Sequence, residues 1–301
     1  MDVGAVNRAR LPVWSLVPLA AVGWWVVGFL PWLAGGMRAV PVGGRVPLPL
    51  SPSLLGSLVL GTLVGGLVAG LLCLATPRRR LGVPATLGGL VLAVVVVLAV
   101  AVSVLRRDAP DSFSSDRLVV TGLCVVVVVG ALGGWALGSA AAFGRPGTGL
   151  ALAVLAGAGP AWLSSLAVLA VDTSTSYAGL TVVGRIAVWA GAAVLVLALA
   201  TVGARPASRL AWWPLLLLAT WFVSPLLTAA AYLEPLLRPG MGLPGTLPDS
   251  LGAAWQVFWL AAAPSQRDLV PWFAALVVAA LIALVRANVR GPSTAEPALA
   301  E

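Results

Sequence analysis

Residues 121–138 read TGLCVVVVVGALGGWALG and contain no charged side chain. Gly130, Gly134 and Gly138 recur at every fourth position, so a helix places them on one face. Small residues at this spacing let a second membrane helix approach closely. Gly61 and Gly65 repeat the pattern in another apolar run. The stretch therefore predicts a membrane helix that packs through its glycines.

The composition extends this prediction to the whole chain. Of 301 residues, 60% are hydrophobic and only 9% are charged, whereas a soluble domain has about 25% charged residues. Because so few polar groups cannot cover a water-soluble globule, we expect the lipid bilayer to be the main solvent. All 18 basic residues are arginine, beside abundant alanine, valine and glycine. That usage is typical of a GC-rich bacterial genome.

Eight apolar segments have the length of membrane helices. They are residues 11–33, 54–75, 84–105, 118–143, 148–171, 180–202, 211–232 and 269–285. We expect an all-α, polytopic helical bundle with one transmembrane domain at residues 11–287. Residues 1–10 form a short N-terminus, and residues 288–301 a disordered tail. An even number of spans places both termini on the same side of the membrane.

The arginines predict the orientation of the bundle. Ten lie on the side of the termini and eight on the other, and the loops on the terminus side are short and basic. Such loops favour the cytoplasm, so both termini are predicted to be cytoplasmic, in the inner membrane of a bacterial cell. The net charge of +8 is explained in this way without nucleic acid as a partner.

Two connections contain patterns of their own. Residues 34–53 are rich in glycine and proline, and we expect a small hairpin or an extended loop that lies on the membrane. Near residues 251–263, Trp255, Phe258 and Trp259 share one face of a helix too short to span a bilayer. They are predicted to be interfacial anchors, in a helix that is either interfacial or re-entrant.

The sequence offers little catalytic chemistry. It contains no histidine, and none of its ten acidic residues lies inside a predicted span. Histidine-based triads, zinc sites and proton relays are therefore excluded, and we expect no enzyme activity, metal or cofactor. Arg185 lies about one turn inside a predicted span and is expected to pair with Asp172 at the outer face, or to extend toward the interface. An intramembrane enzyme would need outer carboxylates such as Asp268 to gather at one mouth.

One row of hydroxyl groups is a candidate polar path. Thr220, Ser224 and Thr228 recur at every fourth position on either side of Pro225. The row either faces a solute or packs around a proline kink.

Two functions fit these patterns. The glycine series and the lack of intramembrane charge favour a non-enzymatic accessory or scaffold subunit of a cell-envelope complex, with a membrane or envelope protein as partner, or a homo-oligomer. The alternative is a permease-like transporter of an uncharged or lipid-like solute, which would use the hydroxyl row.

Overall fold

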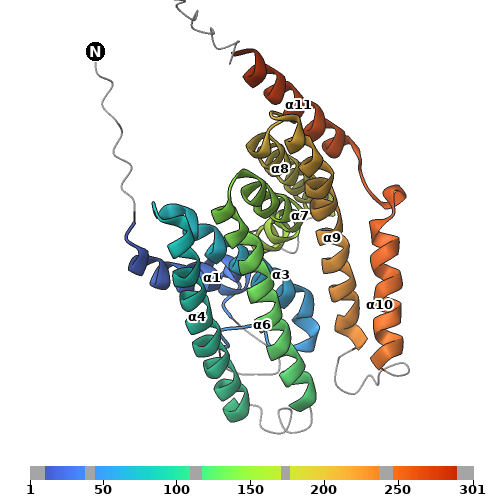
Figure 1. The fold of residues 1–301 in the computed structure, drawn as a ribbon. Helices are drawn as coiled ribbons and strands as arrows, with labels where there is room; N and C mark the ends of the chain where they lie inside the picture. Colours follow the sequence, from blue (N-terminus) through green and yellow to red (C-terminus); the bar gives the residue numbers. More distant parts are fainter. Residues whose placement is uncertain (1–10, 38–44, 109–116, 171–176, 237–246, 290–301) are drawn as a thin grey trace, which may run out of the picture.

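The computed structural model describes residues 11–37, 45–108, 117–170, 177–236 and 247–289, and the regular elements in these ranges are all helical. The α-helices are α1 (Leu16–Gly28), α2 (Leu30–Ala34), α3 (Leu55–Leu71), α4 (Arg79–Asp108), α6 (Arg117–Ser139), α7 (Arg145–Ala170), α8 (Tyr177–Val202), α9 (Trp212–Leu236), α10 (Leu247–Ala262) and α11 (Val270–Val289) (Figure 1). Short 3-10 turns are η1 (Val13–Ser15), η2 (Pro52–Leu54), η3 (Leu72–Ala75), η4 (Ala140–Phe143), η5 (Ala207–Ala211) and η6 (Pro264–Gln266).

Six helical segments in the described ranges are long and apolar enough to cross a membrane. They are Pro52–Ala75, Arg79–Arg107, Val119–Phe143, Arg145–Leu169, Gly179–Val202 and Ala207–Leu236, which match the second to seventh predicted spans. The first and eighth predicted spans contain the shorter apolar helices Val13–Gly28 and Val270–Arg286. The all-helical class is confirmed and the apolar helices indicate a membrane protein, but the count of eight spans is not confirmed.

Both predicted ends of the chain fall largely outside the described ranges. Residues 1–10 lie outside them. Helix α11 extends to Val289, and the rest of the predicted tail lies beyond it.

The first apolar segment is not one continuous helix. Helix α1 ends at Gly28, and α2 has Pro31 in its first turn, where the missing N–H costs no helix hydrogen bond. Helix α2 in turn ends before Gly36, whose φ of 83° suits glycine.

A non-helical segment at residues 46–50 lies in the hydrophobic core. Val46 and Leu48 are almost completely buried against α1, α3, α4 and α6. Two indoles hold the segment: Trp25 Nε1 donates to the Pro47 oxygen at 3.1 Å, and Trp32 Nε1 to the Val46 oxygen at 2.9 Å. The prediction of a loop lying on the membrane is therefore wrong for these residues, because their apolar side chains fill a space between helices.

The first packing unit consists of this segment with α1, α3, α4 and α6. Glycines bring its backbones into contact. A Cβ added at Gly134 would overlap the Leu63 oxygen of α3, and one at Gly138 the Leu67 oxygen. Toward α1, a Cβ at Gly65 would overlap the Trp24 oxygen, and one at Gly61 would lie 2.7 Å from the Phe29 ring. Gly130 of α6 faces the Thr62 hydroxyl of α3 in the same manner.

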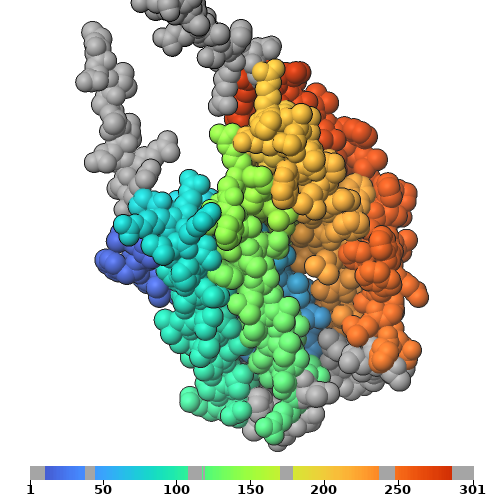
Figure 2. Space-filling view, viewed as in Figure 1, coloured from blue at the N-terminus to red at the C-terminus, as the bar shows by residue number. Residues whose placement is uncertain are grey.

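The second packing unit has its core between α7, α8, α9 and α11. Leu195, Leu199 and Leu216 form the centre of this core and are 0–2% exposed. A smaller cluster, which includes Val64 of α3 and Ala158 of α7, joins the two units. In the space-filling view α4 and α6 lie on one side of the visible face, and α9 to α11 on the other (Figure 2).

Glycines 133 and 134 provide a test of the α3–α6 contact. We expect Gly134→Ala to destabilise the detergent-solubilised protein by about 1–3 kcal/mol, since the new methyl group meets backbone that cannot move aside. The control Gly133→Ala, whose methyl group would meet no atom within 4 Å, should be neutral or stabilising. Denaturant titration followed by circular dichroism measures both. Equal losses in the two variants would contradict the packing described.

Candidate functional site

Helices α10 and α11 form a broken pair beside α9 and α8 (Figure 1). Helix α10 runs antiparallel to α9: the Phe258 and Phe222 rings stack with centroids 5.8 Å apart, and Trp221 Nε1 donates to the Ala262 oxygen at 2.9 Å. Trp221 is roughly 14 Å from the start of α9 at 1.5 Å per residue. The break between α10 and α11 therefore lies within the apolar length of α9.

The sequence encodes this break. Pro264 follows the end of α10, and Ala263 before it has the extended conformation (φ −62°, ψ 135°) that residues preceding proline prefer. Helix α11 then begins with a carboxylate cap, since the Val270 N–H donates to Asp268 Oδ1 at 3.0 Å. A carboxylate is favourable at the positive end of a helix.

Arg267 closes two gaps in backbone hydrogen bonding at the break. Pro225 has no N–H, so the carbonyl of Trp221 four residues earlier lacks its helical donor. The Nη2 of Arg267 donates to that oxygen at 2.8 Å. Its Nε donates to the oxygen of Ala261 at 3.3 Å, one of the last carbonyls of α10. The guanidinium carbon also lies 4.2 Å from the centroid of the Trp221 ring, a cation–π contact.

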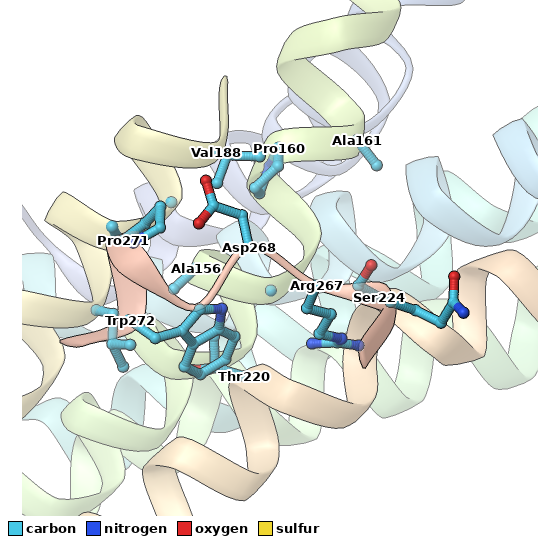
Figure 3. A pocket seen from close by; sticks show the side chains of 15 residues that line it. Ala156, Pro160, Ala161, Val188, Thr220, Ser224, Arg267, Asp268, Pro271 and Trp272 are labelled. Carbon is cyan, nitrogen blue, oxygen red and sulfur yellow. The ribbon is translucent and has the colours of Figure 1, made fainter. Parts of the chain in front are cut away.

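A cavity of about 260 Å³ adjoins this arginine. Four helices and the break line it, through Ala156, Gly157, Pro160 and Ala161 of α7, Val188, Gly191, Ala192 and Leu195 of α8, Thr220 and Ser224 of α9, Pro271 and Trp272 of α11, and Gln266, Arg267 and Asp268 between α10 and α11. Figure 3 shows the Asp268 carboxylate on the side of Pro160 and Val188, and the Arg267 guanidinium on the other side of the connecting segment. A guanidinium has five N–H donors, and the two bonds above leave others available for a ligand.

The cavity is closed toward one end of the bundle and exposed near the middle of its helices. Its lining is buried at Ala156, Leu195 and Thr220, which lie toward the start of α7, the end of α8 and the start of α9. It is exposed at Val188 and Ser224, which lie near the midpoints of α8 and α9. The exposed part of the lining therefore lies partway along the bundle.

The structure brings two of the three predicted hydroxyl residues to this cavity. Thr220 is buried, and its Oγ1 donates to the oxygens of Ala153 at 2.8 Å and Leu216 at 3.0 Å. Ser224 lines the open part. Thr228 is exposed and donates to the Ser224 oxygen at 3.1 Å, outside the cavity lining.

The other predicted site residues lie elsewhere. Trp255 and Phe258 stack with centroids 5.3 Å apart, and Trp259 contacts Phe222 of α9 edge to face at 6.1 Å. Arg185 is an exposed residue of α8, and Asp172, its predicted partner, lies outside the described residues.

Sequence reasoning missed Arg267 as a site residue, because it placed this arginine in an outer connection. Two prolines in the sequence could have indicated this site. Pro225 frees a carbonyl in the middle of α9, and Pro264 ends a helix too short to cross the membrane. Together they indicate a broken crossing with a donor at the break.

No group of three residues suited to metal binding occurs in the described part of the chain. A scan against protein-family models, a search of curated proteins and a search of solved structures find no match to this chain. The site must therefore be interpreted from its own geometry.

A double-mutant cycle tests the link between Pro225 and Arg267. We expect Arg267→Met to destabilise the protein by about 2 kcal/mol, since it leaves two carbonyls without donors. Pro225→Ala supplies an N–H for the Trp221 carbonyl, so the arginine substitution should cost about 1 kcal/mol less in that background. Denaturant titration of the four proteins gives the coupling energy. Additive effects within about 0.3 kcal/mol would contradict the arrangement.

Proposed function

We propose that this chain is a permease-like membrane carrier of a small solute that bears an anionic or strongly accepting group. The observation that carries the proposal is Arg267, held beside a cavity at the break between α10 and α11. Charged groups at membrane depth are costly and mark solute pathways. Discontinuous helices near the bilayer midplane commonly form the substrate sites of secondary transporters.

The lining of the cavity suggests the class of solute. A volume of about 260 Å³ suits a small metabolite. The guanidinium offers N–H donors in a planar fork that matches a carboxylate or a phosphate. Val188, Pro160 and Trp272 supply apolar contacts. Arg267 thus favours an acidic solute over the uncharged one expected from the sequence.

A cavity that is closed toward one end of the bundle fits one state of alternating access. Leu195, Leu199 and Leu216 fill the space between the cavity and the end of the bundle where α9 begins. With the predicted orientation, that end is cytoplasmic, so the cavity is closed toward the cytoplasm. Pro160 and Pro225 interrupt the hydrogen bonding of α7 and α9 beside the cavity, where a change of kink would open the closed end.

A broken α10–α11 crossing also supports eight crossings in all. Leu11 N–H donates to the Ala75 oxygen at 3.2 Å, so the start of the described chain lies at the end of the bundle where η3 ends. Since α3 begins at the opposite end, the chain crosses once between Leu11 and Pro52. Helix α10 lies along α9, which favours one half of this broken crossing over the interfacial or re-entrant helix that the sequence predicted.

The glycine series, by contrast, no longer argues for an accessory subunit. Gly134 and Gly138 pack against α3 of the same chain, and Gly61 and Gly65 pack against the α1 region. The glycines of the predicted series are therefore used for packing within the chain.

Cysteine labelling tests whether the cavity holds water from the outer side. In a Cys73→Ala, Cys124→Ala background, we expect Ser224→Cys to react with a membrane-impermeant maleimide added to intact cells. The matched control is Leu218→Cys, an exposed position of the same helix that is 50% exposed but outside the cavity. It should react at least about tenfold more slowly, because the reactive thiolate forms in water and not in lipid.

The same variants then report on the solute. Small carboxylates and inorganic phosphate are the first probes, and a transported solute should slow the labelling of Ser224→Cys. Absence of labelling at this position from either side of the membrane would contradict the carrier and favour a face covered by lipid or by a partner protein.

A further inference from the structure

A carboxylate lies in the solute cavity beside the arginine. Arg267 and Asp268 are consecutive residues between η6 and α11, and both line the cavity. Arg267 has an extended backbone (φ −130°, ψ 143°), which directs neighbouring side chains to opposite sides of the chain. Figure 3 shows this division, with the carboxylate toward Pro160 and Val188 and the guanidinium on the other side of the segment. The cavity therefore contains one positive and one negative group at separate places.

The two charges do not neutralise each other. Arg267 donates to the oxygens of Trp221 and Ala261, and Asp268 Oδ1 accepts from the Val270 N–H. The structure describes no ion pair between the two side chains, and the hydrogen-bond partners described for both are backbone groups. A carboxylate has about four acceptor sites on its two oxygens. Asp268 therefore keeps acceptor capacity for a ligand, just as Arg267 keeps N–H donors.

The rest of the described lining adds no further charge. Helices α7, α8 and α9 contribute small, apolar and hydroxyl side chains, and α11 contributes Pro271 and Trp272. On the side of Asp268 the neighbours are the apolar side chains of Pro160 and Val188. A carboxylate against apolar groups at membrane depth is costly unless a donor or a cation meets it. The surroundings of Asp268 thus favour a ligand with a positive group.

We propose that the solute is a small amino acid, whose carboxylate binds Arg267 and whose ammonium group binds Asp268. This solute class rests on the proposed carrier function and narrows it. A solute with an acidic group alone would bring a second negative charge near Asp268, and an amine alone would meet the guanidinium. A zwitterion satisfies both groups. It also enters the cavity without net charge, which lowers the cost of leaving water.

Matched probes separate the contributions of the two charges. 4-Aminobutyrate carries both, butyrate only the carboxylate, and butylamine only the ammonium group. L-Alanine and propionate form a second pair with a shorter distance between the charges. Isothermal titration calorimetry of the purified full chain in detergent, at pH 7 and constant ionic strength, measures each affinity. We expect at least one of the two amino acids to bind at least about tenfold more tightly than its matched carboxylate and than butylamine.

Two variants then test the role of Asp268. Asp268→Asn removes the charge but keeps the cap of α11, because an asparagine oxygen accepts from the Val270 N–H equally well. In this variant the amino acid should bind at least about tenfold more weakly, and butyrate more tightly, since the carboxylate that repels it is gone. Loss of structure would weaken both probes. The control Asp249→Asn removes a carboxylate in the first turn of α10, outside the cavity, and should change each affinity less than about twofold.

The results distinguish this solute class from the carrier function itself. Carboxylates that bind as tightly as the matched amino acids would overturn the zwitterion and leave an acidic solute in the cavity. Equal weakening of amino acid and butyrate in Asp268→Asn would also overturn it, because Asp268 would then only support the start of α11. Absence of binding by every probe contradicts the amino acid, and labelling of Ser224→Cys then decides separately whether the carrier function stands.

Discussion

Backbone carbonyls at helix breaks must be hydrogen-bonded within a membrane protein, because hydrocarbon supplies no donor. In this chain the indole N–H groups of five tryptophans donate hydrogen bonds to such carbonyls. The pairs are Trp25 with Pro47, Trp32 with Val46, Trp162 with Val27, Trp213 with Gly203 and Trp221 with Ala262. Every acceptor lies at a helix end or in a non-helical segment. An indole has a large apolar surface and a single donor, so it fills space between helices and satisfies one carbonyl.

Arg267 performs the same task at the break between α10 and α11, but with a different consequence. An indole at this position would satisfy one carbonyl and leave no further donor. The guanidinium satisfies the Trp221 and Ala261 carbonyls and still has N–H groups left. The energetic cost of placing a charge at this depth is partly offset by these bonds and by the Trp221 ring. Structural capping and ligand binding are therefore compatible roles of one side chain.

Composition and local periodicity were sufficient to predict the all-helical class and the positions of six long apolar helices, because each helix satisfies its own backbone. The breaks could not be predicted in the same way. Trp162 reaches Val27 across 135 positions, and Arg267 reaches Trp221 across 46. A local sequence pattern shows that a tryptophan is amphipathic, but it does not show which distant backbone carbonyl accepts a hydrogen bond from the indole N–H. Likewise, the spacing of Gly134 and Gly138 predicts a close neighbour without naming α3.

The two packing units differ in whether helix-interrupting prolines lie beside a cavity. Where Gly134 and Gly138 meet the backbone of α3, sliding would bring side chains into carbonyls, so bistability is unfavourable there. The unit of α7, α8, α9 and α11 also has close glycine contacts, since a Cβ at Gly157 would lie 2.7 Å from the Thr220 oxygen and one at Gly191 2.9 Å from the Ala156 oxygen. In this unit, however, prolines interrupt two helices beside a cavity. In the proposed carrier, these proline-interrupted helices beside the cavity are therefore the part of the bundle expected to rearrange.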